Sequence, residues 1–453
     1  MMKTTDFKTF LLLLFFLPGE FLFSQADTSE LKISLKEAQE YALQNNKMII
    51  SAKLGVEESK RTVWESISAA LPQVSTSGSF TDNLKLMTTL LPGEFFSTPE
   101  NPIPAGTKIP ITFGSQFNSN ASITASLLLF NAPLYIGIET SKLASRLSEE
   151  SLKKSESDTR ESVATAYYLI LVSEKSLEIL EGNIANLNET LKSTRAMFSA
   201  GMAESTDVDQ MISNVRNVEN SLSALQRNIE LNYNLLRFQL GLSPEIKLTL
   251  TETLESMTAG INVESILSQD FDHTRHIDYR LVEGQEMVSS MLLKSQKASV
   301  LPTLAGFYNY GTNGMGDKLN DLSWFPNSMI GVQLDFPLFA SGQRYSKIKK
   351  AKISLDKATN TKDMVAEQLL IQEKQLRYNL VNANLQYQSQ KENVDVARRV
   401  YASTENKFKQ GMASSLDLTQ ANSLYLQAEN NYVSALMNLL QTKLALDKLL
   451  NNI

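Results

Sequence analysis

Phe198-Ser-Ala-Gly-Met-Ala-Glu-Ser-Thr-Asp207 and Phe408-Lys-Gln-Gly-Met-Ala-Ser-Ser-Leu-Asp417 are two versions of one stretch, and 210 positions separate them. Each version follows a long run with the character of a helix and opens a second such run. A repeat of this kind predicts one structural unit that the chain uses twice. Gly201 and Gly411 stand where a left-handed glycine ends a helix, so each version predicts a sharp turn between two helices.

The residues after each turn share one apolar spacing. Apolar or small side chains recur at alternating intervals of three and four, which is the seam of a left-handed coiled coil. In the first copy these positions are Val208, Met211, Val215, Val218, Leu222, Leu225 and Ile229. In the second copy they are Leu418, Ala421, Tyr425, Ala428, Tyr432, Ala435 and Leu439. Both copies therefore predict a helix that packs along its length.

The composition excludes several classes of protein. The 453 residues include no cysteine and two histidines, and the formal net charge is −6. Thiolate metal sites and cysteine catalysis are excluded, and dispersed basic residues argue against nucleic-acid binding. No phosphate loop, HExxH motif or paired catalytic constellation occurs, so the chain is not expected to be an enzyme or to carry a cofactor or metal. His273 and His276 have a spacing that suits a metal, but a solvated helix start is the preferred interpretation.

The first residues have the pattern of a secretory signal. Lys3 and Lys8 form a weakly basic start, residues 10–17 are apolar, and Ser24 and Ala26 offer small residues for cleavage. We predict a signal peptide over 1-25. A membrane anchor is the alternative, but the apolar run is shorter than a spanning helix needs.

The mature chain divides into two repeats, 27-250 and 251-453. Each is predicted as a helix, a β-hairpin, a very long helix, a turn and a last helix. In the first repeat the helices cover 34–70, 138–200 and a run to Leu240, and hairpin 73-128 has strands at 73–81 and 117–127. In the second repeat they cover 275–300, 343–410 and the C-terminal run, and hairpin 303-337 has strands at 303–310 and 329–336. The loop of the first hairpin is rich in proline and glycine and is longer, so the hairpin tips are expected to be exposed.

The strands have lengths that cross a bilayer when they are tilted. Hydrocarbon offers no hydrogen bonds, so a membrane strand must be paired on both edges. Four strands cannot close a barrel, whereas three chains would supply twelve. The alternative is a soluble hairpin that packs on helices.

At this point the chain resembles the TolC-like outer-membrane efflux proteins over nearly its whole mature length. The opening helix Leu35-Lys-Glu-Ala-Gln-Glu-Tyr-Ala-Leu43, the pairs Leu71-Pro72 and Leu301-Pro302, and the two turn stretches carry the resemblance through their order and spacing. The resemblance implies a mostly α fold with a small transmembrane β part. The duplicated long-helix repeat would form a trimeric α-helical periplasmic tunnel plus a 12-stranded β-barrel, with four strands per chain.

The resemblance also implies a function and partners. The protein would be the passive outer-membrane channel of a tripartite efflux or type I secretion system, with its tunnel in the periplasm. Its partners would be itself as a homotrimer, outer-membrane lipid, a periplasmic adaptor (membrane fusion protein) and an inner-membrane pump. The alternative is a secreted or periplasmic coiled-coil structural protein without a channel. The sequence does not identify the exported substrate.

Two groups of residues receive roles from the resemblance. The adaptor-docking tip comprises Phe198, Gly201, Met202, Ala203, Phe408, Gly411, Met412 and Ala413. The tunnel constriction comprises Asp417, Gln420 and Asp207, with Asp417 preferred. Gln420 stands where the family often has a second carboxylate, which weakens the expected anionic ring.

Some of these residues also have plainer interpretations. If Ser205 and Ser415 cap the new helices, both aspartates lie in a first turn and favour the helix dipole. Trp64 is expected in the core. Trp324, just before the last strand, is expected in a membrane aromatic belt that Phe95, Phe96 and Phe325 could join.

Overall fold

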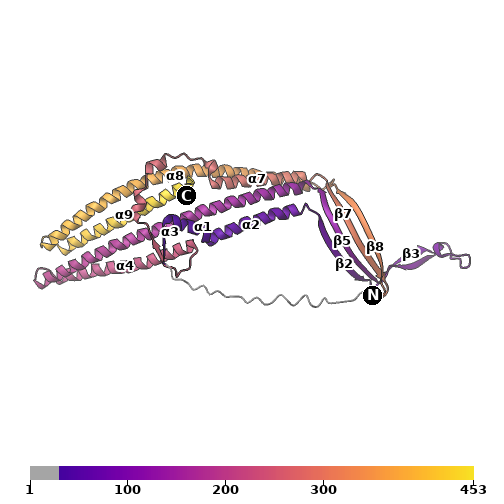
Figure 1. Cartoon of the computed structure of the whole chain (residues 1–453), viewed down its shortest axis with the longest axis horizontal. Coiled ribbons are helices and arrows are strands. Elements are labelled where there is room, and N and C mark those ends of the chain that lie inside the picture. Colours follow the sequence, from indigo (N-terminus) through magenta and orange to yellow (C-terminus); the bar gives the residue numbers. More distant parts are fainter. Residues whose placement is uncertain (1–29, 453) are drawn as a thin grey trace.

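The computed structural model describes residues 30–452 as an elongated molecule, with helices over most of its length and a sheet towards one end (Figure 1). The signal peptide predicted at 1-25 lies outside the described residues. The helices are α1 (Leu35–Asn45), α2 (Lys47–Ser68), α3 (Ala132–Ser199), α4 (Ser205–Leu240), α5 (Leu254–Ala259), α6 (Val263–Leu267), α7 (Ile277–Ala298), α8 (Gln343–Lys409) and α9 (Ser415–Leu449), with 3-10 turns η1 (Gly93–Phe96) and η2 (His273–Arg275). None of the helices in the described part of the chain combines the length and apolarity needed to cross a membrane.

The helix predicted over 34–70 is two helices. Asn46 ends α1 and caps α2, because its Oδ1 accepts a hydrogen bond from the Met48 amide at 2.7 Å. The helix predicted from residue 138 begins earlier, since Asn131 caps α3 through the Leu134 amide at 3.0 Å. Asparagine at a cap satisfies an amide that the helix leaves free, and this local bond decides both boundaries.

The two histidines lie just before the helix that precedes the second hairpin, His273 in η2 and His276 at the cap of α7. His276 is buried, and its Nδ1 accepts a hydrogen bond from the Asp278 amide at 3.3 Å. His273 lies edge-on to Tyr279. The predicted solvated start is therefore wrong for His276. Burial lowers the pKa of that imidazole, so it caps α7 in its neutral form.

Four strands form one antiparallel sheet in the order β2 (Gln73–Asp82), β5 (Phe117–Phe130), β7 (Thr303–Gly316) and β8 (Ser323–Asp335). The first hairpin pairs from Gln73 with Ser126 to Asp82 with Phe117. The second hairpin is longer than predicted, because β7 continues through three glycines. Gly314 leaves room for the ring of Trp324 across the strands, and a Cβ there would lie 3.1 Å from that ring. The loop of this hairpin is therefore only 317–322.

The helices nearest the sheet follow the same order as the strands. Helix α2 packs on α3, α3 on α7, and α7 on α8, and each of the four is joined directly to its strand (Figure 1). Helices and sheet thus form one continuous layer. Its two free edges are α2 with β2 and α8 with β8.

The main core lies where α1, α3, α4 and α9 meet. Tyr167 and Ile170 of α3, Leu236 of α4 and Leu440 of α9 are fully or almost fully buried in it. The Tyr167 hydroxyl donates to the Ile33 carbonyl at 3.2 Å, which fastens β1 (Leu31–Ile33) to α3. Strand β1 pairs in parallel with β6 (Leu248–Leu250). This core packs the α3–α4 helix pair against the α8–α9 pair.

Candidate functional sites at the two ends of the molecule

The two longest helices, α3 and α8, each end in a turn of the same type. Gly201 and Gly411 have φ angles of +74° and +71°, in the left-handed region that favours glycine. The Met202 amide donates to the Met197 carbonyl and the Met412 amide to the Lys407 carbonyl, both at 2.8 Å. In each case the residue after the glycine donates to a carbonyl of the last helical turn, as in a Schellman motif.

The residues around the two turns differ in exposure. Met202 and Met412 are exposed, while Ala203 and Ala413 are half-buried. Phe198 is 48% exposed but its counterpart Phe408 only 6%. Phe408 packs with Tyr401, Leu418 and Ala421, and Met197 from the first repeat joins this cluster. Two exposed methionines on rigid turns are therefore the shared surface of this end.

Asp207 and Asp417 occupy the third position of their helices. The caps are Glu204 and Ser414, so the prediction of Ser205 and Ser415 as caps is wrong. Asp417 accepts from the Ser414 amide at 2.9 Å and from the Ser414 hydroxyl at 2.7 Å. The pKa of Asp417 is lowered by the hydroxyl and then by the amide of Ser414. Both carboxylates thus accept a hydrogen bond from the amide of the capping residue, and both pKa values are lowered.

Only Asp207 also contacts the other repeat. Its Oδ1 accepts a hydrogen bond from the Ser415 hydroxyl, and this bond is the main reason that the pKa of Asp207 is lowered. Farther along the same helices, Asn214 donates to Thr419 at 3.0 Å. These two bonds join α4 to α9 near the turns, whereas Asp417 and Gln420 are exposed. The Asp207–Ser415 bond cannot be predicted from either repeat alone, because the two residues are 208 positions apart.

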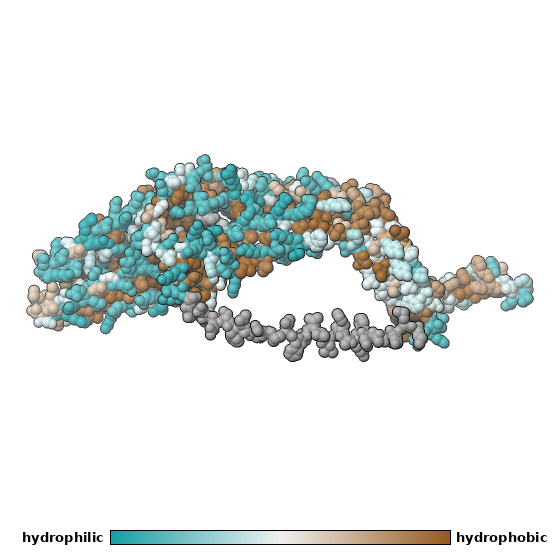
Figure 2. All heavy atoms as spheres, viewed as in Figure 1, coloured by the Kyte–Doolittle hydropathy of each residue, from teal (hydrophilic) through white to brown (hydrophobic). Residues whose placement is uncertain are grey.

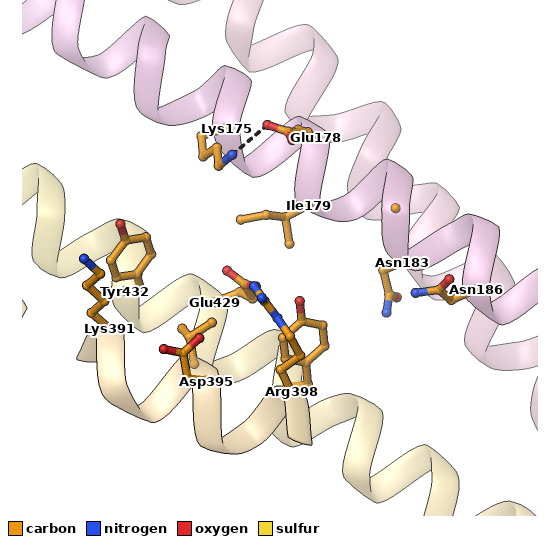
Figure 3. A pocket seen from close by; sticks show the side chains of 13 residues that line it. Lys175, Glu178, Ile179, Asn183, Asn186, Lys391, Asp395, Arg398, Glu429 and Tyr432 are labelled. Atoms are coloured by element: carbon orange, nitrogen blue, oxygen red, sulfur yellow. Dashed lines mark hydrogen bonds and ion pairs between the residues drawn. The ribbon is translucent and has the colours of Figure 1, made fainter. Parts of the chain in front are cut away.

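A cleft of about 400 Å³ separates α3 from the α8–α9 pair (Figure 3). Each wall carries its own ion pair: Lys175 pairs with Glu178 at 2.8 Å on α3, and Arg398 of α8 lies 4.0 Å from Glu429 of α9. At its floor the buried Asn183 donates to Asn422 at 2.6 Å. The cleft therefore ends at a polar contact that fastens the two helix pairs together.

One face of the sheet is apolar. Cross-strand partners share a face, and Val74, Ala125, Tyr308 and Ile330 form one such row across all four strands. Apolar residues gather on the sheet, whereas hydrophilic residues dominate the helical part of the surface (Figure 2).

The opposite face is lined by hydroxyl and amide groups. Ser77 and Ser122 share a hydrogen bond at 2.9 Å, and Asn120 donates to Asn313 at 2.6 Å. Asn309 likewise donates to Thr124 at 2.8 Å. The sheet is thus apolar on one side and polar, but almost uncharged, on the other.

The free edges of the layer carry exposed apolar side chains. Trp64 on α2 is 60% exposed, so its predicted place in the core is wrong for the single chain. Exposed apolar residues also mark α8, namely Ile353, Ile371, Tyr378 and Leu385. Every residue of β2 is exposed. These edges have the character of contact surfaces that the chain alone does not cover.

The aromatic residues expected in a belt fall in two places. Trp324 and Phe325 lie within β8, near its first end, rather than before it. Phe95 and Phe96 lie in η1, beyond the sheet at the end of a separate hairpin (Figure 1). The two pairs therefore do not share a site within one chain.

The comparisons with known proteins agree with this architecture. The family described as "Outer membrane efflux protein" matches residues 39–242 and 285–452. Outer membrane protein TolC of Vibrio cholerae is 22% identical over 344 residues, covering 73% of this chain and 77% of that protein.

Solved structures show the same fold. The outer membrane protein VceC of Vibrio cholerae superposes with a TM-score of 0.70 at 16% identity, covering 92% of this chain and 95% of that one. The open state of the MtrE outer membrane channel of Neisseria gonorrhoeae gives a TM-score of 0.70 at 15% identity, covering 92% and 88%. The chain belongs to the outer membrane efflux protein family, and its location is accordingly the outer membrane.

Proposed function

We propose that three copies of this chain form the passive exit channel of a tripartite efflux or secretion system. The open layer carries this proposal: within the described residues its sheet has four strands and two free edges, and four strands cannot close a barrel. The β8 edge of one copy would pair with the β2 edge of the next, and α8 would pack beside α2. Contacts between unlike edges close into a ring when the rotation allows it.

The two faces of the sheet support a membrane barrel. Membrane barrels present apolar residues to lipid and polar residues to the lumen. The face with Val74 and Ile330 would therefore contact outer-membrane lipid, and the face with Ser77 and Asn120 would line the lumen. The two proposed repeats, 27-250 and 251-453, each contain one of the two stretches that match the family. Relatives that are channel proteins support a role other than catalysis.

The opposite end would dock the periplasmic adaptor, which joins the channel to an inner-membrane pump. The docking surface would comprise Phe198, Gly201, Met202, Ala203, Gly411, Met412 and Ala413. Phe408 is buried, so it would support this surface from beneath rather than contact the adaptor. Two features support this: the turns are held rigidly by backbone bonds, and Met202 and Met412 are exposed. Methionine adapts well to a packed partner surface.

The tunnel constriction would lie just above these turns, at Asp417, Gln420 and Asp207. Asp417 is the better candidate of the two aspartates. Its side chain is exposed, whereas Asp207 is engaged by Ser415 of the other repeat. Three copies of Asp417 would make an anionic ring that attracts cations.

The experiment is a native mass measurement in detergent, followed by single-channel recording in a planar bilayer. A trimer that conducts is the expected result. A monomer that stays soluble without detergent would instead support a coiled-coil structural protein, and a trimer without conductance would refute the channel.

A further inference from the structure

Beyond the sheet, the first repeat carries a hairpin that the second lacks. Strands β3 (Met87–Pro92) and β4 (Lys108–Phe113) pair only with each other and project past the end of the sheet (Figure 1). The loop between them is held by hydrogen bonds. The Gly93 amide donates to the Thr107 carbonyl at 2.7 Å, and the Ile103 amide donates to the Ser97 hydroxyl at 3.0 Å. A Cβ on Gly93 would lie 2.6 Å from Ile103, so the loop closes tightly on itself.

One face of this hairpin is a strip of mainly apolar side chains, the apolar strip. The register pairs Met87 with Phe113, Thr89 with Ile111, and Leu91 with Ile109, and paired residues share a face. The opposite face carries Thr88, Leu90, Pro92, Lys108, Pro110 and Thr112. Met87 and Phe113 are exposed in the single chain, as is Phe95 at the tip. The apolar strip therefore lacks a complete cover.

An isolated two-stranded hairpin is marginally stable in water, so this strip needs a partner. The net charge of the segment argues against binding to a lipid headgroup. Residues 83–116 contain Lys85, Lys108, Glu94 and Glu100, which sum to zero, whereas anionic lipid is recognised by clustered basic residues. The hairpin also continues directly from β2, the free edge that the proposed trimer pairs with a neighbouring copy.

We propose that the β3–β4 hairpins of three copies pack their apolar strips together above the mouth of the channel and narrow it. This inference rests on the proposed trimer. Four strands from each of three copies, spaced about 4.8 Å and tilted about 40°, give a barrel radius of about 12 Å. Six-residue strands reach about 20 Å, so each hairpin is long enough to meet the others at the axis.

The test uses the absence of cysteine from the chain. Leu91→Cys places a single thiol on the apolar strip, and Leu90→Cys places one at the same height on the opposite face. Both proteins are purified as trimers, reconstituted in phospholipid vesicles and oxidised. A disulfide needs two Cα atoms within about 7 Å, so it reports direct contact between copies. Three thiols around one axis can form one pair, so about two-thirds of Leu91→Cys chains should run as dimers without reductant.

Leu90→Cys should stay monomeric on the same gel. Equal cross-linking of the two variants, or none, would overturn the inference while the trimer and its conductance leave the proposed function intact. Protection of Leu91→Cys from a maleimide only in vesicles that contain lipopolysaccharide would assign the strip to lipid and also overturn it. Absence of trimers in the wild type as well as in both variants would refute the proposed function, and this inference with it.

A second variant measures the effect on the channel. Replacing residues 87–113 by a short Gly-Ser link removes the hairpin and leaves the four-stranded sheet in place. We expect trimers whose single-channel conductance is higher than that of the wild type. Unchanged conductance would contradict the proposed narrowing.

Discussion

The bond between Ser415 and Asp207 is the sharpest place to test how the two repeats hold each other. Ser415→Ala removes the hydroxyl that donates to Asp207 and leaves the cap at Ser414 intact. A hydrogen bond to a carboxylate is worth about 1.5–3 kcal/mol, and partial exposure of Asp207 reduces this to about 1 kcal/mol. Local opening at the turns should therefore become about fivefold more frequent.

Hydrogen–deuterium exchange of the trimer, followed in peptides that cover 200–215, measures this opening. Ser205→Ala is the matched control, because Ser205 is the exposed counterpart of Ser415 in the first repeat. A double-mutant cycle with Asp207→Asn isolates the pair from the cap that Asp207 also makes. Equal exchange in Ser415→Ala and Ser205→Ala would refute the reasoning.

The same bond predicts a dependence on pH. Hydrogen bonding lowers the folded-state pKa of Asp207 below its unfolded value. The contact therefore contributes stability above the unfolded pKa and loses it as the pH falls through the folded pKa. Exchange at the turns should rise on that acidic side in the wild type, and the rise should be smaller in Ser415→Ala.

Three further predictions concern the proposed channel. Asp417→Asn should weaken cation selectivity and relieve block by divalent cations in bilayer recordings, and Asp207→Asn should do less; equal block in wild type and Asp417→Asn would count against the anionic ring. Gly411→Val should leave membrane insertion intact but reduce export in cells, because a β-branched residue resists a φ of +71°; full export would argue against docking at the turns. Trp64→Asp should shift the native mass in detergent from trimer towards monomer, since it places a charge on a free edge, and an unchanged trimer would show that α2 lies outside the subunit contact.

Features set by a few neighbouring residues could be predicted from the sequence. Gly201 and Gly411 mark their turns because a left-handed helix end depends on local backbone sterics. Strands β2 and β5 follow from the period-two pattern of their side chains, with mostly apolar residues on one side and polar residues on the other. Strand β7 was truncated in the prediction, because the glycines at 311, 314 and 316 favour a loop when their cross-strand neighbours are unknown.

Contacts between distant residues could not be predicted in the same way. An apolar residue on a helix suggests burial, but its own repeat does not show whether the fold covers it, and Trp64 is exposed in the single chain. Ser414 and Ser415 both suit a helix cap, and the choice depends on one residue of register. The Asp207–Ser415 bond requires the relative placement of two repeats, which no pattern within either repeat specifies. The roles of the turns in docking and of Asp417 in the constriction stay predictions.

The two unlike edges of the layer have a genetic consequence. In the proposed ring every copy supplies one edge to each neighbour, so a single copy with a damaged β8 edge opens a seam through the whole wall. If half of the chains in a cell carry such damage and assemble at random, only about one ring in eight contains three sound copies. Edge mutations should therefore be dominant over the wild-type gene, whereas a loss of expression from one of two gene copies would be recessive.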